Sequence, residues 1–291
     1  MIACGIVLGS GKREVVLSSP LLSAAGALGY DPPPAEMLEW LGAVVTPVLT
    51  AEPRRGLEEP VLLRTAAGYL VRTGRRNPGV RRALRRHGRA WAGCGRPLIV
   101  AVYGATVPDL AEAAWQAAEA EAVQALELHL PHDAAPQAYG AAVRAARDEA
   151  GLPCLVRLAH EAAAAEVARA AEEAGADALV VAAPPLGRAR GAGGTWVTGP
   201  LHSPALAPLT VQRVSAVRAA TGLPIIARGG LARPADALAM LAAGACALQL
   251  DSILHVDPGT PEAFYAALEA EMARCSAPDW AAYLAALRPE E

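Results

Sequence analysis

Residues 221–252 read TGLPIIARGGLARPADALAMLAAGACALQLDS. Two apolar runs, Leu223–Arg228 and Ala245–Leu250, flank a segment, Pro234–Ala243, whose alanines and leucines recur at helical spacing. This order predicts a strand, a helix and a second, parallel strand. The pair Gly229-Gly230 separates the first strand from the helix, where backbone N–H groups and the helix dipole favour an anion. It predicts either a phosphate site or simply a tight turn.

The same alternation of apolar runs and helical segments extends from this unit towards both ends of the chain. Several of the runs begin with Gly-x-Pro or Ala-Gly-Ala, and they are almost wholly apolar, as in parallel strands that are covered on both faces. Eight strands are predicted, centred near residues 22, 44, 99, 126, 155, 179, 225 and 248. We therefore expect a single (β/α)8 TIM barrel over residues 1–291, with its chemistry at the C-terminal ends of the strands.

Three segments lie outside this repeat. Residues 1–19 predict an N-terminal β-hairpin, with Ile2–Leu8 and Glu14–Leu17 on either side of a glycine-rich turn. Residues 278–291 predict a C-terminal helix and a tail. Residues 50–77 show little periodicity, which predicts a long loop that acts as a lid or as a wall of a site.

The composition is that of an ordinary globular protein of enzyme size. The chain has 291 residues, of which 53% are hydrophobic and 19% charged, and a formal net charge of -3. We expect no nucleic-acid partner from this balance. No apolar run approaches the roughly 18 residues of a membrane span, and no basic signal segment opens the chain, so we expect a cytoplasmic protein without membrane contact. Five widely spaced cysteines indicate neither a disulfide framework nor a zinc motif.

Lysine and asparagine are almost absent. Lys12, in the predicted hairpin turn, is the only lysine, which argues against an enzyme that forms a Schiff base through a buried lysine. Asn77 is the only asparagine. Because the chain is slightly acidic overall, we interpret a helical cluster of arginines as a solvated surface rather than an anion site. The cluster comprises Arg81, Arg82, Arg85, Arg86 and Arg89.

Polar side chains gather at the predicted C-terminal ends of the strands. Core histidines would be distributed over both ends of a barrel, so their collection at one end indicates a site. Histidines with a carboxylate are common ligands of divalent metals, although no spacing here matches a known ligand motif. Five of the six histidines lie at this rim: His129, His132, His160, His202 and His255.

Four stretches, in order along the chain, carry a resemblance to a known family. They are LSSPLLSAAGALGY at residues 17–30, LGAVVTPVLTAEPR at 41–54, AGYLVRTGRRNPG at 67–79 and QLDSILHVDP at 249–258. They resemble the first two strands, an Asn-Pro-Gly segment and the last strand of class 1 dihydroorotate dehydrogenases. The resemblance covers nearly the whole chain. It implies a barrel with FMN over its C-terminal face and the phosphate held after strands seven and eight.

The resemblance also implies roles for individual residues and for partners. A small-molecule ligand is implied, as is a homodimer or an electron-transfer partner subunit. His132 takes the place of the catalytic base and Arg157 that of a catalytic lysine, while His129 and Arg72 are implied to bind substrate. The implied FMN-binding residues are Ala24, Ala25, Gly26, Thr46, Arg157, Gly199, Gly229, Gly230, Asp251 and Ser252.

Several of these positions depart from the family's pattern. Pro47 replaces the lysine that follows strand two, and the Gly-Thr pair of the phosphate loop becomes Asp251-Ser252. Polar atoms that a buried ring leaves unmatched cost about 1–3 kcal/mol each, so loss of the orotate-binding amides removes recognition of that ring. The asparagines that grip orotate correspond to Val71, His129, Ala134 and Ala183.

Three functional hypotheses follow. The first is a dihydroorotate dehydrogenase-like barrel that has lost the family's substrate and catalytic residues and lacks that activity. The second is an FMN-dependent oxidoreductase of the same family, with His132 as base and a substrate poorer in hydrogen-bonding groups. The third is a metal-dependent lyase or hydrolase that uses the rim histidines.

Overall fold

Eight parallel strands form a nearly closed barrel in the computed structural model, which describes residues 2, 4–9, 14–59, 61–160 and 163–287. The sheet order is β3-β14-β13-β10-β9-β8-β7-β4, and a parallel bridge between Leu22 and Ala43 joins its two edges. The predicted TIM barrel is confirmed, and every predicted strand centre falls inside a strand. The strands are β3 (Leu21–Ser23), β4 (Val44–Val45), β7 (Leu98–Tyr103), β8 (Val123–His129), β9 (Cys154–Arg157), β10 (Ala178–Val181), β13 (Ile225–Arg228) and β14 (Ala247–Leu250).

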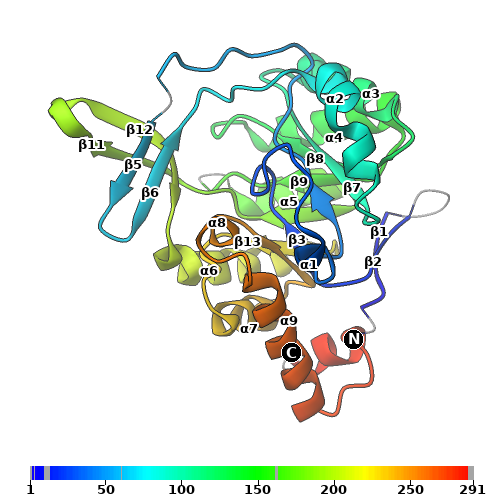
Figure 1. Cartoon of the computed structure of the whole chain (residues 1–291). Helices are drawn as coiled ribbons and strands as arrows, with labels where there is room; N and C mark the ends of the chain where they lie inside the picture. The colour runs from blue at the N-terminus through cyan, green and yellow to red at the C-terminus, as the bar shows by residue number, and fades with distance from the viewer. Residues whose placement is uncertain (1, 3, 10–13, 60, 161–162, 288–291) are drawn as a thin grey trace.

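Helices surround the barrel (Figure 1). Local sequence fixes where they begin: Thr106 and Asp109 form a capping box in which each side chain accepts a hydrogen bond from the other's backbone N–H. No helix in the described ranges is both long enough and apolar enough to cross a bilayer. The helices are α1 (Ala35–Leu38), α2 (Val80–Ala92), α3 (Val107–Ala118), α4 (Pro136–Ala150), α5 (Ala164–Glu173), α6 (Ala207–Arg218), α7 (Pro234–Ala242), α8 (Ile253–Val256) and α9 (Thr260–Arg274).

The two ends of the chain pack against this barrel. Strands β1 (Ile6–Leu8) and β2 (Val15–Leu17) pair antiparallel, which confirms the hairpin, and their buried leucines join the main hydrophobic core. Lys12 and the turn around it lie outside the described residues, as does the tail 288–291. The final helix is α10 (Trp280–Leu287), and the Trp280 indole donates to the carbonyl of Cys246, 2.9 Å away, just before β14.

Residues 50–77 do not form the single long loop that their lack of periodicity predicted, although five of them, within residues 69–76, line a cavity as a wall of a site would. This segment holds a hairpin of β5 (Val61–Thr65) and β6 (Gly68–Arg72). β6 pairs with β12 (Trp196–His202), which in turn pairs with β11 (Leu186–Arg190), so a four-stranded antiparallel sheet projects from the barrel (Figure 1). We call it the small sheet. Its strands are mostly half-buried, so they lack the continuous apolar runs that mark the barrel strands.

The arginine cluster of α2 lies on the solvent-facing side of that helix. All five arginines are exposed, whereas Ala83 and Trp91 on the same helix are buried. Arg81 pairs with Glu119 on the neighbouring surface, with 3.3 Å between Nε and Oε2. This placement agrees with the interpretation of the cluster as a solvated surface.

The single asparagine braces the loop that leads from the small sheet back to α2. The buried Asn77 Oδ1 accepts hydrogen bonds from Gly79 N at 2.9 Å, Thr50 N at 3.2 Å and Thr50 Oγ1 at 3.1 Å. Its Nδ2 donates to the carbonyl of Arg75 at 2.9 Å, and its backbone pairs in both directions with Arg54. The side chain and backbone of Asn77 thus join residues 50–54 to residues 75–79 and fix Arg75 at the mouth of the barrel.

Asn77→Ala should lower the free energy of unfolding by about 2–3 kcal/mol, because two buried backbone N–H groups lose their acceptor. Urea denaturation followed by circular dichroism measures the change. Thr50→Val removes the hydroxyl that lies 3.1 Å from Asn77 Oδ1 and 2.6 Å from the carbonyl of Glu52, but it leaves both backbone N–H groups paired with Asn77 and should cost less. Equal stability of Asn77→Ala and the wild type would contradict the bracing role.

Candidate functional site

A central cavity of about 430 Å³ opens at the C-terminal ends of the barrel strands. Strand ends supply its floor, including His129 of β8, Arg157 of β9 and Arg228 of β13. Loops supply its walls, among them Arg75 and His132. Most of the predicted rim residues thus meet in one space, as the barrel topology requires.

A second hollow of about 490 Å³, the side cavity, adjoins the central one. Gly229 and Gly230, after β13, and Ser252, after β14, line it. Four residues line both cavities and lie between them: Tyr69 of β6, Pro184, His202 of β12 and Asp251.

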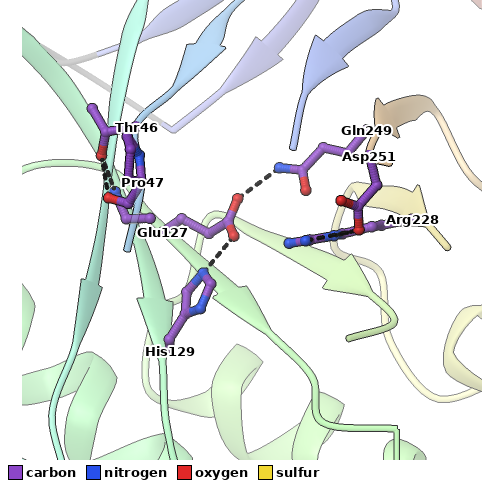
Figure 2. Close-up of polar contacts among 8 residues, drawn as sticks. Thr46, Pro47, Glu127, His129, Arg228, Gln249 and Asp251 are labelled. Atoms are coloured by element: carbon purple, nitrogen blue, oxygen red, sulfur yellow. Dashed lines mark hydrogen bonds and ion pairs between the residues drawn. The ribbon is translucent and has the colours of Figure 1, made fainter. Parts of the chain in front are cut away.

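A buried carboxylate lies at the base of the site (Figure 2). Glu127 of β8 is fully buried, and its Oε1 lies 2.6 Å from His129 Nε2. Its Oε2 accepts a hydrogen bond of 2.6 Å from Gln249 Nε2, which projects from β14. Residues 127 and 129 share one face of β8 because side chains alternate along a strand. Sequence reasoning missed Glu127 because it considered strand ends, although a lone charge within the apolar run Gln124–Leu130 was the available signal.

The surroundings of this carboxylate determine the charges at the base of the site. Burial alone would raise the pKa of Glu127, but hydrogen bonding to His129 and the charge of Arg228 lower it to about 2. Burial and the nearby Arg157 lower the pKa of His129 to about 3. Burial and Arg228 also lower the pKa of Arg157 to about 10. At neutral pH the base therefore holds a carboxylate, a neutral imidazole and charged guanidinium groups.

A second ion pair lies at the junction of the two cavities. Arg228 donates from Nε at 3.0 Å and from Nη2 at 2.9 Å to the same oxygen, Asp251 Oδ2 (Figure 2). His202 Nδ1 lies 3.6 Å from that oxygen, and the His202 ring stacks on Tyr69 at 5.1 Å between centroids. Burial opposes ionisation of Asp251, but Arg228 and His202 outweigh it, so its pKa is lowered. This contact links the small sheet to the rim of the barrel.

The predicted site residues fall into two groups. Four of them line neither cavity, namely Ala24, Thr46, Arg72 and Gly199. Ala24 is buried, and Arg72 lies in β6. Thr46 Oγ1 accepts from Ala101 N at 3.1 Å and bonds the carbonyl of Pro47, while a Cβ on Gly199 would lie 2.3 Å from the carbonyl oxygen of Val71. These contacts give both residues structural reasons for their identity. The remaining predicted residues line a cavity: Ala25, Gly26, His129, His132, Arg157, Gly229, Gly230, Asp251 and Ser252.

The rim histidines do not converge on a metal site. His160 lines the side cavity, and His129, His132 and His255 line the central one. Within the part of the chain that the structure describes, no three His, Cys, Asp or Glu side chains are grouped so that they could hold a metal ion.

The side cavity is poorly suited to the phosphate of FMN. Gly229 and Gly230 have φ of 100° and 78°, a backbone that leaves N–H groups approachable. However, the described lining of this cavity contains no arginine or lysine, and it includes the Asp251 carboxylate. Arg228, the nearby cation, is already paired with Asp251. A dianionic phosphate here would meet a like charge without a free cation, so these residues do not fit FMN at its phosphate end.

The lowered pKa of His129 predicts a loss of stability in acid. The unfolded chain takes up a proton near pH 6.5, whereas the folded protein resists protonation down to about pH 3. The free energy of unfolding should therefore fall as the pH drops through this window, by about 1–2 kcal/mol between pH 6.5 and 5. Glu127 titrates only below this range. Urea denaturation of His129→Gln should show a shallower fall between pH 7 and 5; superimposable curves would contradict the assignment.

Comparisons with known proteins agree with this architecture. The family model described as dihydroorotate dehydrogenase matches residues 13–272. The chain is 32% identical over 260 residues to the dihydroorotate dehydrogenase B (NAD(+)) catalytic subunit of Bacillus pumilus, covering 83% of this chain and 84% of that protein. It is also 32% identical over 281 residues to the subunit of the same name from Desulforudis audaxviator, covering 88% and 89%. The chain belongs to the dihydroorotate dehydrogenase family.

Proposed function

We propose that this barrel binds a small ligand in its central cavity and does not oxidise dihydroorotate. The observation that carries the proposal is the contact between His129 Nε2 and Glu127, 2.6 Å long. Of the positions where the family resemblance implies orotate-binding amides, only His129 keeps a polar side chain. One of its two ring nitrogens is already used at the base of the barrel.

The other positions offer a pyrimidine ring no hydrogen bonds from their side chains. Val71, Ala134 and Ala183 are aliphatic, and Pro47 stands where the family has a lysine. Carbonyl and N–H groups of a buried ring would remain unmatched, at a cost of about 1–3 kcal/mol for each group. Discrimination by paired donors and acceptors is then lost, which supports a change of ligand.

A working FMN oxidoreductase is the second candidate. His132 and Arg157 line the same cavity, so a base and a hydrogen-bond donor could both face a ligand there. This candidate also needs a bound flavin, and the ion-paired Asp251 disfavours the flavin's phosphate. The first proposal therefore has the stronger support.

We also propose that this chain associates with another subunit. The relatives are named catalytic subunits, which places them in larger assemblies. For this chain we propose either a homodimer or a complex with an electron-transfer subunit. Light scattering of the purified chain distinguishes a dimer from a monomer, and co-purification tests for the second subunit.

The purified chain, incubated with FMN, dihydroorotate and an artificial electron acceptor, should form no orotate above the rate without protein. A relative such as the Bacillus pumilus catalytic subunit provides the positive control. A yellow protein that contains stoichiometric flavin and turns over dihydroorotate would refute the proposal.

Asp251→Asn should increase FMN affinity by roughly tenfold, because it removes a negative charge and frees Arg228 for the phosphate. Riboflavin lacks the phosphate, so its affinity should stay unchanged and serves as the matched control. Quenching of flavin fluorescence on titration with protein measures both. An equal effect on the two flavins, or none on either, would contradict the role given to Asp251.

A further inference from the structure

We infer that the central cavity binds a small organic dianion, a dicarboxylate or a phosphate monoester, between Arg75 and Arg157. This inference deepens the proposed function, since it assumes that the central cavity is the ligand site. It adds the charge of the ligand, which the proposed function leaves open.

Arg157 offers a buried donor that the protein does not use. It lies at the end of β9, is 7% exposed and lines the central cavity. Its Nε is buried, and no acceptor among the described residues meets it. Leaving a buried charged donor unpaired is costly, whereas an anionic ligand oxygen would satisfy it.

Arg75 presents a second guanidinium to the same cavity. Its Cζ lies 3.7 Å from the centroid of the Tyr103 ring, at the end of β7. Stacking fixes the plane of the guanidinium and leaves its N–H edge available for a carboxylate or phosphate. Within the described ranges, no carboxylate forms an ion pair with Arg75. Asn77 holds the carbonyl of this residue, so the loop is fixed in place before a ligand arrives.

The charges around the cavity favour two negative charges on the ligand. The described lining contains four arginines, namely Arg75, Arg76, Arg157 and Arg228, against one carboxylate, Asp251, which Arg228 neutralises. Glu127 beneath the base adds one further negative charge, to which Arg157 is electrostatically coupled. Two positive charges therefore remain unbalanced, in a chain whose formal net charge is -3.

The rest of the cavity suits a short carbon skeleton. Its volume of about 430 Å³ lies in the range of small-molecule sites. Val48, Val71, Pro184 and Pro200 supply apolar walls. These walls can pack against hydrocarbon, so the arginines are the groups of this lining that select the charge of a ligand.

Isothermal titration calorimetry with the full chain tests the inference. The dianionic probes are glutarate, benzene-1,3-dicarboxylate and phenyl phosphate, which separate the dicarboxylate source from the phosphate source. The monoanions 3-carbamoylbenzoate, nearly the same shape as the aromatic dicarboxylate, and orotate are the matched controls. At least one dianion should bind roughly tenfold or more tightly than either monoanion. If no dianion binds, or if a monoanion binds as tightly as the dianions, the inference is overturned.

Substitutions test whether the dianion binds at Arg75 and Arg157. Arg157→Met and Arg75→Gln should each weaken the binding dianion by roughly tenfold or more, while Arg82→Gln, on the exposed face of α2, should not. Arg75 lies in a half-buried loop, so its variant keeps the test valid if Arg157→Met fails to fold. Wild-type affinity in Arg75→Gln would overturn the assignment. If no dianion binds, this inference fails but the proposed absence of dihydroorotate oxidation still stands. If the chain turns over dihydroorotate, only the proposed function fails.

Discussion

The buried carboxylate of Glu127 is the constraint around which the site is organised. A charge with no exposed surface is tolerated in a protein interior only when it is hydrogen-bonded and electrostatically compensated. His129 and Gln249 provide two hydrogen bonds of 2.6 Å, and Arg157 and Arg228 provide positive charge. Burial and the charges of Arg157 and Arg228 lower the pKa of His129 and keep it neutral, although the Glu127 carboxylate favours its protonation. One residue inside the barrel thus influences the charges of the polar side chains directly above it.

The barrel strands and the rim above them are under different constraints. Most side chains of the strands pack in the apolar core, where alanine, valine and leucine predominate. Positions at the strand ends carry no such packing constraint, so they can change without loss of the fold. At this rim Arg75, Arg157 and Arg228 lie beside aliphatic side chains and a single aspartate, Asp251, so the lining of the central cavity carries more positive than negative charge.

The sequence revealed the barrel well because its strands are continuous apolar runs with recurring joints. It did not reveal the small sheet, since β5 and β6 are mostly half-buried and β6 pairs with β12, more than a hundred residues further on. For the site, the barrel topology predicted that histidines such as His129 would gather at the rim, and the family resemblance added Arg157 and Asp251. The contribution of Arg75 could not be predicted, because it depends on how the side chain of Asn77 folds a loop that has no periodic pattern.

Four residues lie between the two cavities, Tyr69, Pro184, His202 and Asp251, and none of them belongs to a strand of the barrel. The side chains of Tyr69, His202 and Asp251 can rotate about single bonds, and all four residues can be substituted, without disturbing a barrel strand. The two cavities at the mouth of the barrel are therefore separated by residues that can change without a change in the barrel. Substitution at these four positions can lengthen or shorten the binding space while the barrel beneath it stays the same.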